Sequence, residues 1–275
     1  MPTVKHVAPR PSLLSLRRRM VLCCLVMAGM AAGIAGVSAA PAPVATVPIV
    51  LYDGAKNNRP DEQDFTFLAL PSVSPTISGG ATILNTSSDK SIFAGYFSKS
   101  TAQLVLDRAI GYTVSFTVQV ELEDHAGSDK NNDGTEDRAG FSLIVLSSDK
   151  RGIELGFWKD RIWAQEGGSG STLFTQAEYA PFDTQSARMP YALAVQGDTY
   201  TLSSNGTPIL SGKLRDYTAF NDFPDFYQTP NLIFVGDDTR TASATIGLAY
   251  VAVGPTISNG LSLDRKVYVS LLMRL

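Results

Sequence analysis

The acidic segment 129–137 has the side-chain spacing of a calcium-binding loop. Its oxygen donors stand at relative positions 1, 3, 5, 7 (a backbone carbonyl) and 9: Asp129, Asn131, Asp133, Thr135 and Asp137. Calcium takes six to eight oxygen ligands, and Gly134 permits the sharp bend of such a loop. Gly140 replaces the closing glutamate of an EF-hand, so Asp124, Glu136 or another loop would complete the shell. We expect a structural calcium ion; the alternative is a solvated hairpin loop with residues chosen for turn geometry.

Two tryptophans flank a predicted chain reversal at Lys159-Asp160. Flat aromatic faces suit sugar rings, and nearby polar groups can hydrogen-bond to sugar hydroxyls. The predicted ligand-binding residues are Glu154, Trp158, Arg161, Trp163 and Gln165. The alternative is that both tryptophans belong to the core or pair across strands, which is the commoner fate of large aromatic residues in strands.

The sequence lacks the residues needed for zinc-dependent catalysis or for a nucleophilic serine. After position 40 the chain has one histidine, His125, and no cysteine, so a zinc centre lacks ligands. No serine stands in a Gly-x-Ser-x-Gly motif. Asp237-Asp238 follows a predicted strand and is expected to be a turn, with an acid pair or a second cation contact as alternatives. We predict that the protein is not an enzyme.

The segments that must position these residues are strands. Short runs rich in β-branched and aromatic residues alternate with turn residues, and in Tyr112–Leu122 apolar and polar residues alternate with a period of two. The other predicted strands are Ile49–Tyr52, Phe65–Leu70, Ala81–Leu84, Ile92–Phe97, Gln103–Leu106, Phe141–Leu146, Gly152–Trp158, Arg161–Gln165, Tyr191–Gln196, Thr199–Ser203, Thr207–Lys213, Leu232–Val235 and Ala242–Val253. Asn205-Gly206 predicts a tight hairpin because both residues tolerate positive φ. The pattern indicates an all-β protein, a two-sheet antiparallel jelly-roll sandwich over 48–254.

The first 40 residues have the pattern of an export signal. Arg17, Arg18 and Arg19 precede an apolar run from Met20 to Val37, and small residues follow at 38–40. This predicts a cleaved signal peptide at 1–40 and a linker at 41–47; the alternative is an uncleaved anchor helix. Beyond position 40 stand 18 basic and 26 acidic residues, a net charge of −8. That balance excludes the electrostatic footprint of nucleic-acid binding.

Several motifs occur in order along 48–254: Leu51-Tyr52-Asp53-Gly54, Glu136-Asp137-Arg138-Ala139-Gly140-Phe141, Gly152-Ile153-Glu154-Leu155-Gly156-Phe157-Trp158, Arg161-Ile162-Trp163-Ala164-Gln165 and Leu214-Arg215-Asp216-Tyr217. They resemble a family of bacterial exported domains with the concanavalin A-like lectin/glucanase jelly roll. The resemblance implies surface display by a sorting tail, but segment 255–275 has no Pro-Glu-Pro sorting motif, which favours secretion. Glucanases of this fold carry acids as Glu-x-Asp-x-x-Glu; here Gly156 and Lys159 replace the last two.

These observations favour an exported, non-catalytic lectin-like module that binds glycan or extracellular matrix and carries a structural calcium ion. One alternative is a structural cell-envelope protein without a small ligand. The other is a glycoside hydrolase whose acids come from separate strands. Fold alone does not separate these hypotheses, because one sandwich serves all three functions.

Overall fold

The structure is a computed structural model that describes residues 47–101, 103–168, 173–220 and 226–256. The signal peptide predicted at 1–40, nearly all of the linker and nearly all of the tail lie outside these residues. No helix within the described ranges is long and apolar enough to cross a lipid bilayer.

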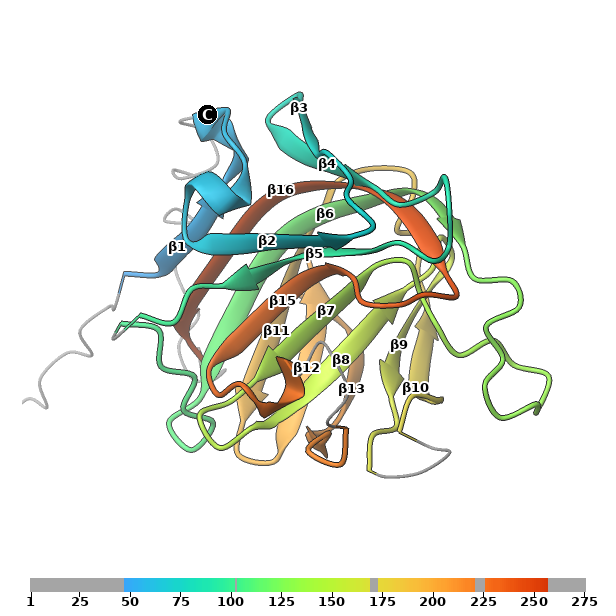
Figure 1. The fold of residues 1–275 in the computed structure, drawn as a ribbon. Helices are drawn as coiled ribbons and strands as arrows, with labels where there is room; N and C mark the ends of the chain where they lie inside the picture. Colours follow the sequence, from blue (N-terminus) through green and yellow to red (C-terminus); the bar gives the residue numbers. More distant parts are fainter. Residues whose placement is uncertain (1–46, 102, 169–172, 221–225, 257–275) are drawn as a thin grey trace, which may run out of the picture. The chain divides into compact units, whose positions relative to one another are not determined.

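Two eight-stranded antiparallel sheets form the sandwich, as the sequence predicts (Figure 1). Sheet A, the back layer in Figure 1, has the order β13-β12-β11-β6-β16-β4-β3, with β1 paired to β16. Its strands are β1 (Ile49–Asp53), β3 (Thr76–Ser78), β4 (Ala81–Asn85), β6 (Tyr112–Asp124), β11 (Met189–Gln196), β12 (Thr199–Ser204), β13 (Thr207–Lys213) and β16 (Ser243–Pro255).

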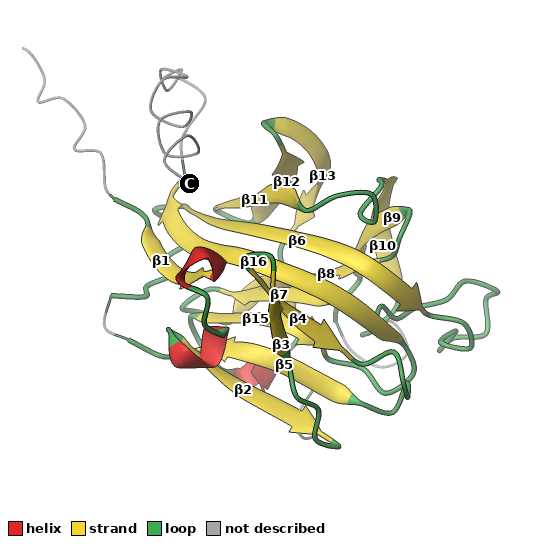
Figure 2. Cartoon of the chain, turned by 90° about the horizontal axis from the view of Figure 1, so that it is seen from above, coloured by secondary structure: helices red, strands yellow, loops and turns green. Residues whose placement is uncertain are grey.

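Sheet B, the front layer, has the order β10-β9-β8-β7-β15-β5-β2, with β14 paired to β8. Its strands are β2 (Phe65–Leu70), β5 (Phe93–Ser98), β7 (Ser142–Leu146), β8 (Arg151–Phe157), β9 (Arg161–Gln165), β10 (Gln176–Pro181), β14 (Arg215–Asp216) and β15 (Leu232–Asp237). The helices of the described chain are short 3-10 turns, η1 (Gly54–Lys56), η2 (Pro60–Glu62) and η4 (Phe226–Gln228) (Figure 2).

The main core fills the space between the sheets. In β6 the residues from Tyr112 to Val120 alternate between buried and half-buried positions, as the period of two requires. In β8 the side chains of Ile153, Leu155 and Phe157 join this core. The intervening residues of β8, Glu154 and Gly156, therefore face away from sheet A.

The outer face of sheet B is covered as well, so all five residues of β7 are buried. Aromatic residues from the chain after β14 pack here against residues of β5, β7 and β15. This second core contains Phe93, Ile144, Leu146, Leu173, Tyr217, Phe226, Tyr227, Leu232 and Phe234. The aromatic residues that follow β14 thus cover a sheet face.

Most predicted strands are confirmed, and so is the hairpin at Asn205-Gly206, whose φ angles are 49° and 78°. The strand predicted at Gln103–Leu106 is wrong. Its amides bond within turns, and Leu106 N–H donates to Asn231 Oδ1 at 2.9 Å, so the buried leucines anchor a loop. The sequence does not predict strand β10, because Gln176–Pro181 lacks an alternating apolar and polar pattern. The structure shows the reason, since most of these residues are only partly buried.

Candidate functional site

The five predicted ligand-binding residues lie in two places. Glu154, Trp163 and Gln165 lie in a covered polar cluster on the outer face of sheet B, and none is more than 1% exposed. Trp158 and Arg161 lie beside the β8–β9 turn, at the edge of an open depression. Trp158 connects the two places, because its ring contacts Trp163 edge to face with centroids 6.1 Å apart.

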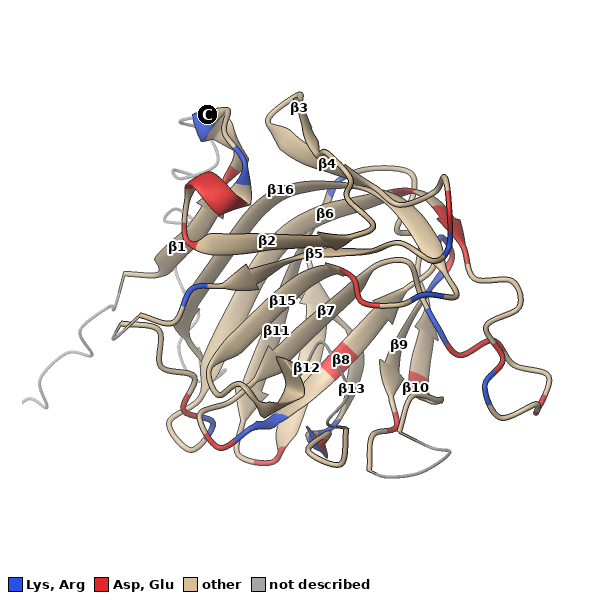
Figure 3. Cartoon of the chain, in the orientation of Figure 1, with Lys and Arg blue, Asp and Glu red and all other residues tan. Residues whose placement is uncertain are grey.

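Glu154 is the centre of the covered cluster and the acidic residue of β8, which Figure 3 colours red. Gln165 Nε2 donates to Glu154 Oε1, and the Tyr227 hydroxyl donates to Oε2. The backbone N–H of Glu154 donates to the Tyr217 hydroxyl at 3.0 Å. Arg138 Nη2 lies 3.9 Å from Glu154 Oε1 and donates to Asp238 Oδ2 at 2.9 Å.

Burial is the main cause of the shifted pKa values in this cluster. It raises the pKa of Glu154 well above its usual range, and the charge of Asp238 acts in the same direction. Arg138 opposes these effects. Burial likewise raises the pKa values of Tyr217 and Tyr227 well above their usual range. The cluster is therefore a poorly hydrated site that disfavours a second negative charge.

Sequence reasoning missed four members of this cluster: Arg138, Tyr217, Tyr227 and Asp238. The available signal was Glu154 itself, a charged residue at an alternate position of an otherwise apolar strand. A buried carboxyl needs hydrogen-bonding partners. The partners are distant in sequence, however, and the strand pattern does not identify them. The expected turn at Asp237-Asp238 instead ends β15, where Asp237 accepts from Thr86 Oγ1 at 2.6 Å and Asp238 enters the cluster.

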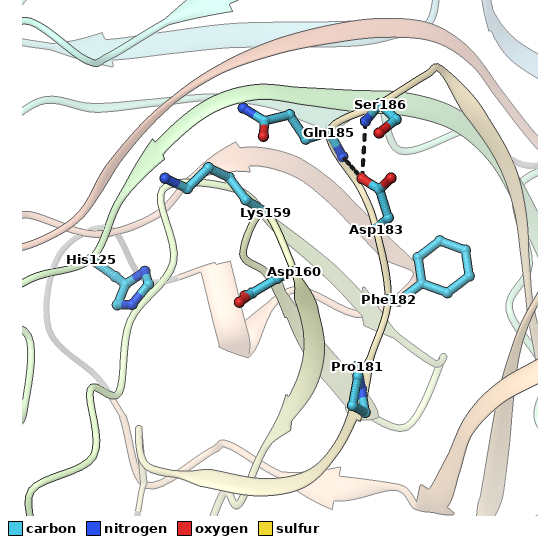
Figure 4. A pocket seen from close by; sticks show the side chains of 8 residues that line it. All are labelled: His125, Lys159, Asp160, Pro181, Phe182, Asp183, Gln185 and Ser186. Carbon is cyan, nitrogen blue, oxygen red and sulfur yellow. Dashed lines mark hydrogen bonds between the residues drawn. The ribbon is translucent and has the colours of Figure 1, made fainter.

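The open depression has a volume of about 870 Å³ and lies between the β8–β9 turn and the chain from β10 to β11 (Figure 4). It combines an aromatic ring, an imidazole, a proline and several polar groups. Its lining residues are His125, Lys159, Asp160, Pro181, Phe182, Asp183, Gln185 and Ser186. The two walls are tied together because Phe182 N–H donates to Asp160 O at 2.9 Å and Thr184 N–H donates to Lys159 O at 3.1 Å.

His125 is held in a fixed position on one side of the depression. Its ring stacks on Trp158 with centroids 3.8 Å apart and an interplanar angle of 8°. Its Nδ1 lies 2.8 Å from both carboxylate oxygens of Glu123, whose side chain is fully buried. Burial raises the pKa of Glu123 despite the hydrogen bond from His125. The Arg161 guanidinium lies over both Trp158 and the exposed ring of Tyr179, at 5.2 and 4.4 Å from the ring centroids.

The opposite wall is a turn built on Asp183. Its carboxylate accepts from the backbone N–H groups of Gln185 at 2.9 Å and Ser186 at 3.0 Å (Figure 4). Hydrogen bonds from the Ser186 side chain and from these amides hold the pKa of Asp183 below its usual range. The depression therefore presents a fixed carboxylate beside exposed amide and hydroxyl groups.

The predicted calcium loop uses its carboxylates to accept backbone hydrogen bonds. Asp129 accepts from the amides of Asn132 and Gly134 at 2.7 and 3.0 Å, and Gly134 has a φ of 87°. Asp137 is buried and accepts from Lys130 and Gln176, so it anchors the base of the loop.

The other oxygen ligands predicted for calcium do not converge on one point. Asn131 donates to Asp133 at 2.9 Å, and Asp133 accepts from the amide of Thr135 at 2.8 Å. Of the suggested closing ligands, Asp124 pairs with Lys90 and Glu136 accepts from Gly127 and Ser128. Across the described ranges, no three His, Cys, Asp or Glu side chains gather as a metal site. Calcium stays a prediction.

Comparison with known families and with curated proteins finds no match to this sequence. Among solved structures, a carbohydrate esterase of the Shiga toxin-encoding bacteriophage phi24B has a TM-score of 0.51 at 10% identity, over 77% of this chain and 100% of that one. The Emp46p carbohydrate recognition domain has a TM-score of 0.46 at 9% identity, over 76% and 98%. A Bacillus subtilis protein of unknown function with a galectin-like fold has a TM-score of 0.44 at 9% identity, over 75% and 96%. The protein thus has a two-sheet antiparallel β-sandwich fold that is similar to the fold of the phage esterase.

Proposed function

We propose that the protein is an exported, non-catalytic lectin-like module that binds glycan in the open depression. The observation that carries this proposal is the lining of the depression, where the His125 ring and Pro181 provide apolar surface among exposed polar groups. A pocket of several hundred Å³ with a few placed polar groups is typical of small-ligand sites. Hydroxyl-rich ligands need both donors and acceptors, and the depression offers both.

The rigidity of the depression supports a binding role. The His125 ring is fixed between Trp158 and Glu123, and the Asp183 turn fixes the facing wall. A preorganised site loses less conformational entropy when a ligand binds. The phage carbohydrate esterase is built on the same sandwich, so carbohydrate chemistry has a precedent on this fold. That similarity concerns the fold only.

The absence of catalysis is part of the proposal and is supported by packing at Gly156. A Cβ atom at this position would lie 2.5 Å from Cε2 and Cζ2 of Trp163. The outer face of β8 therefore has no room for the second acid of the glucanase pattern. Glu154 itself is covered, so an extended polysaccharide does not reach it in this structure.

The proposal is tested by screening the purified protein on an array of polysaccharides and oligosaccharides and measuring the best ligand by calorimetry. The variant Lys159→Ala/Asp160→Ala changes two exposed residues of the rim. We expect it to lose at least about tenfold in affinity, because hydrogen bonds to charged groups contribute about 1.5–3 kcal/mol. The matched control Asp64→Ala/Lys213→Ala changes exposed residues outside the depression and should keep the wild-type affinity. Equal affinity of both variants would refute this site.

Calcium in the 129–137 loop is a separate part of the proposal. The support is the spacing of oxygen donors together with the bend at Gly134, which has the positive φ that such loops require. An ion would replace backbone amides as partners of Asp129 and Asp133 and would order the exposed tip of the loop.

A further inference from the structure

Arg161 stands at the rim of the depression with its N–H donors unused. Its guanidinium makes no hydrogen bond or salt bridge with any residue that the structure describes. An arginine side chain is always charged in proteins and has five N–H donors, so this one remains free to bind an anion. Other arginines of the described chain each pair with a carboxylate: Arg59, Arg108, Arg138, Arg151 and Arg215.

Two aromatic rings hold this guanidinium in place. It lies 5.2 Å from the ring centroid of Trp158 and 4.4 Å from that of Tyr179. A ring face attracts a cation without using its N–H groups as conventional hydrogen bonds do. The Trp158 ring is itself fixed, because it is buried and the His125 ring stacks on it. The cation is therefore positioned in advance while its donors stay available to a ligand.

Arg161 belongs to the same surface as the depression. In the pairing of β9 with β10 it stands directly opposite Pro181, so both side chains lie on one face of sheet B. Pro181 lines the depression, and so do Lys159 and Asp160, which precede Arg161 in the turn. The rim is open to solvent, since the Tyr179 ring on the edge strand β10 is 57% exposed. A ligand that lies against Pro181 therefore meets the guanidinium.

The acids around the depression do not neutralise this cation. Glu123 is bonded to the imidazole of the wall, and Asp183 lies across the depression, where it accepts backbone hydrogen bonds. Lys159 and Asp160 are consecutive and carry opposite charges. The net charge of −8 beyond position 40 is spread over the chain, and exposed charges more than about 8 Å apart are largely screened at physiological ionic strength. Locally, Arg161 remains an unpaired cation.

An oriented guanidinium without a partner selects an anionic group. Its planar fork donates two parallel hydrogen bonds to a carboxylate, and charge-assisted bonds of this kind are about twice as strong as neutral ones. We propose that the glycan bound in the depression is acidic, with uronic acid carboxylates or sulfate groups, and that Arg161 binds one of these anionic groups. This inference rests on the proposed function and names the class of its ligand.

The test compares acidic tetrasaccharides with neutral forms of the same backbone by calorimetry. Tetrasaccharides of polygalacturonate and alginate are measured beside their carboxyl-reduced forms, and a carrageenan tetrasaccharide beside its desulfated form. We expect at least one acidic member to bind at least about tenfold more tightly than its neutral counterpart, because only the acidic member makes charge-assisted bonds to Arg161. The pair that shows the preference identifies the anion as carboxylate or sulfate.

Variants assign the preference to the stacked arginine. Arg161→Gln should reduce it to less than about twofold. The matched control Arg151→Gln removes the same charge at the other end of β8, where Arg151 lies 3.8 Å from Asp216, and should keep the preference. Tyr179→Ala should weaken binding of the acidic member about two- to fivefold, whereas Tyr179→Phe keeps the ring and should bind as the wild type. If Arg161→Gln does not fold, Arg161→Lys takes its place, since it lacks the planar fork and should lose most of the preference.

The outcomes separate this inference from the proposed function. Equal binding of acidic and neutral members would overturn the acidic class, and loss of that binding in Lys159→Ala/Asp160→Ala would leave the proposed function standing. A preference that survives in Arg161→Gln, or that disappears equally in Arg151→Gln, would overturn the role of Arg161. Absence of binding by every acidic and neutral glycan would refute the proposed function and this inference together.

Discussion

At the residue scale, the molecule is organised around one acid that faces away from the main core. Glu154 alternates with Ile153 and Leu155 in β8, so the strand itself turns its carboxyl to the outer face. Two positions along, Gly156 gives space to the Trp163 ring, which in turn packs against Trp158. The absence of a side chain at position 156 thus connects the covered cluster with the wall of the depression.

Gly156→Ala should destabilise the protein by about 1–3 kcal/mol, because its Cβ would lie 2.5 Å from the buried Trp163 ring and neither side can move freely. Urea unfolding followed by tryptophan fluorescence measures the change. Gly254→Ala is the matched control, since its nearest neighbour would lie at an ordinary 3.7 Å, and we expect a change within about 0.5 kcal/mol. Equal stability of both variants would contradict the close packing of Gly156.

At the element scale, the 129–137 loop after β6 has a fixed base and an exposed tip. The base of the 129–137 loop is fixed by Asp137, which is buried and bonds to the amide at the start of β10. The tip is exposed, and its carboxylates bond to neighbouring amides. A loop with a fixed base and an exposed acidic tip is suited to gain order from a cation.

Calcium added after chelation should raise the melting temperature by several degrees, because a ligand at 100 times its dissociation constant adds about 2.7 kcal/mol to the stability of the native state. Thermal unfolding with and without calcium measures the rise. The variant Asp129→Ala/Asp133→Ala should lose it, while Asp64→Ala/Lys213→Ala should keep it. An unchanged melting temperature at millimolar calcium would reject the ion.

At the scale of the whole molecule, buried acids determine how stability depends on pH. Burial raises the pKa values of Glu123, Glu154 and Asp237. Between the unfolded values of about 4 and these raised values the folded protein binds more protons, so the free energy of unfolding should fall as pH rises above about 5. Asp124 and Glu136 have the opposite effect, since hydrogen bonds lower their pKa values and their contribution is lost below about pH 4.

We therefore expect maximum stability near pH 5, measured by urea unfolding at fixed salt from pH 3 to pH 9. Glu123→Gln and Glu154→Gln should each reduce the decline above pH 5, because each removes one proton that the folded state retains. A stability that increases steadily from pH 5 to pH 8 in the wild type would contradict the raised pKa values.

The sequence predicts the sandwich well where a strand carries its own alternating pattern, as β6 does, and where a hairpin carries its own turn residues, as at Asn205-Gly206. It predicts the site only in part. Trp158 and Arg161 flank Lys159 and Asp160 in the sequence, and these two residues line the depression. The facing wall of the depression comes from a turn around Asp183 that has no distinctive motif. Glu154 was identified, whereas Arg138 and Asp238 meet it only through long-range pairing of strands.

Glycan binding in the depression is the central claim, and nuclear magnetic resonance titration tests it most directly. The purified protein, labelled with nitrogen-15, is titrated with the best oligosaccharide from the array screen. We predict that the amide signals of His125, of the β8–β9 turn at 159–160 and of the 182–186 segment move with a single dissociation constant. Shifts concentrated on other surfaces, or no shifts with any glycan at millimolar concentration, would contradict the account.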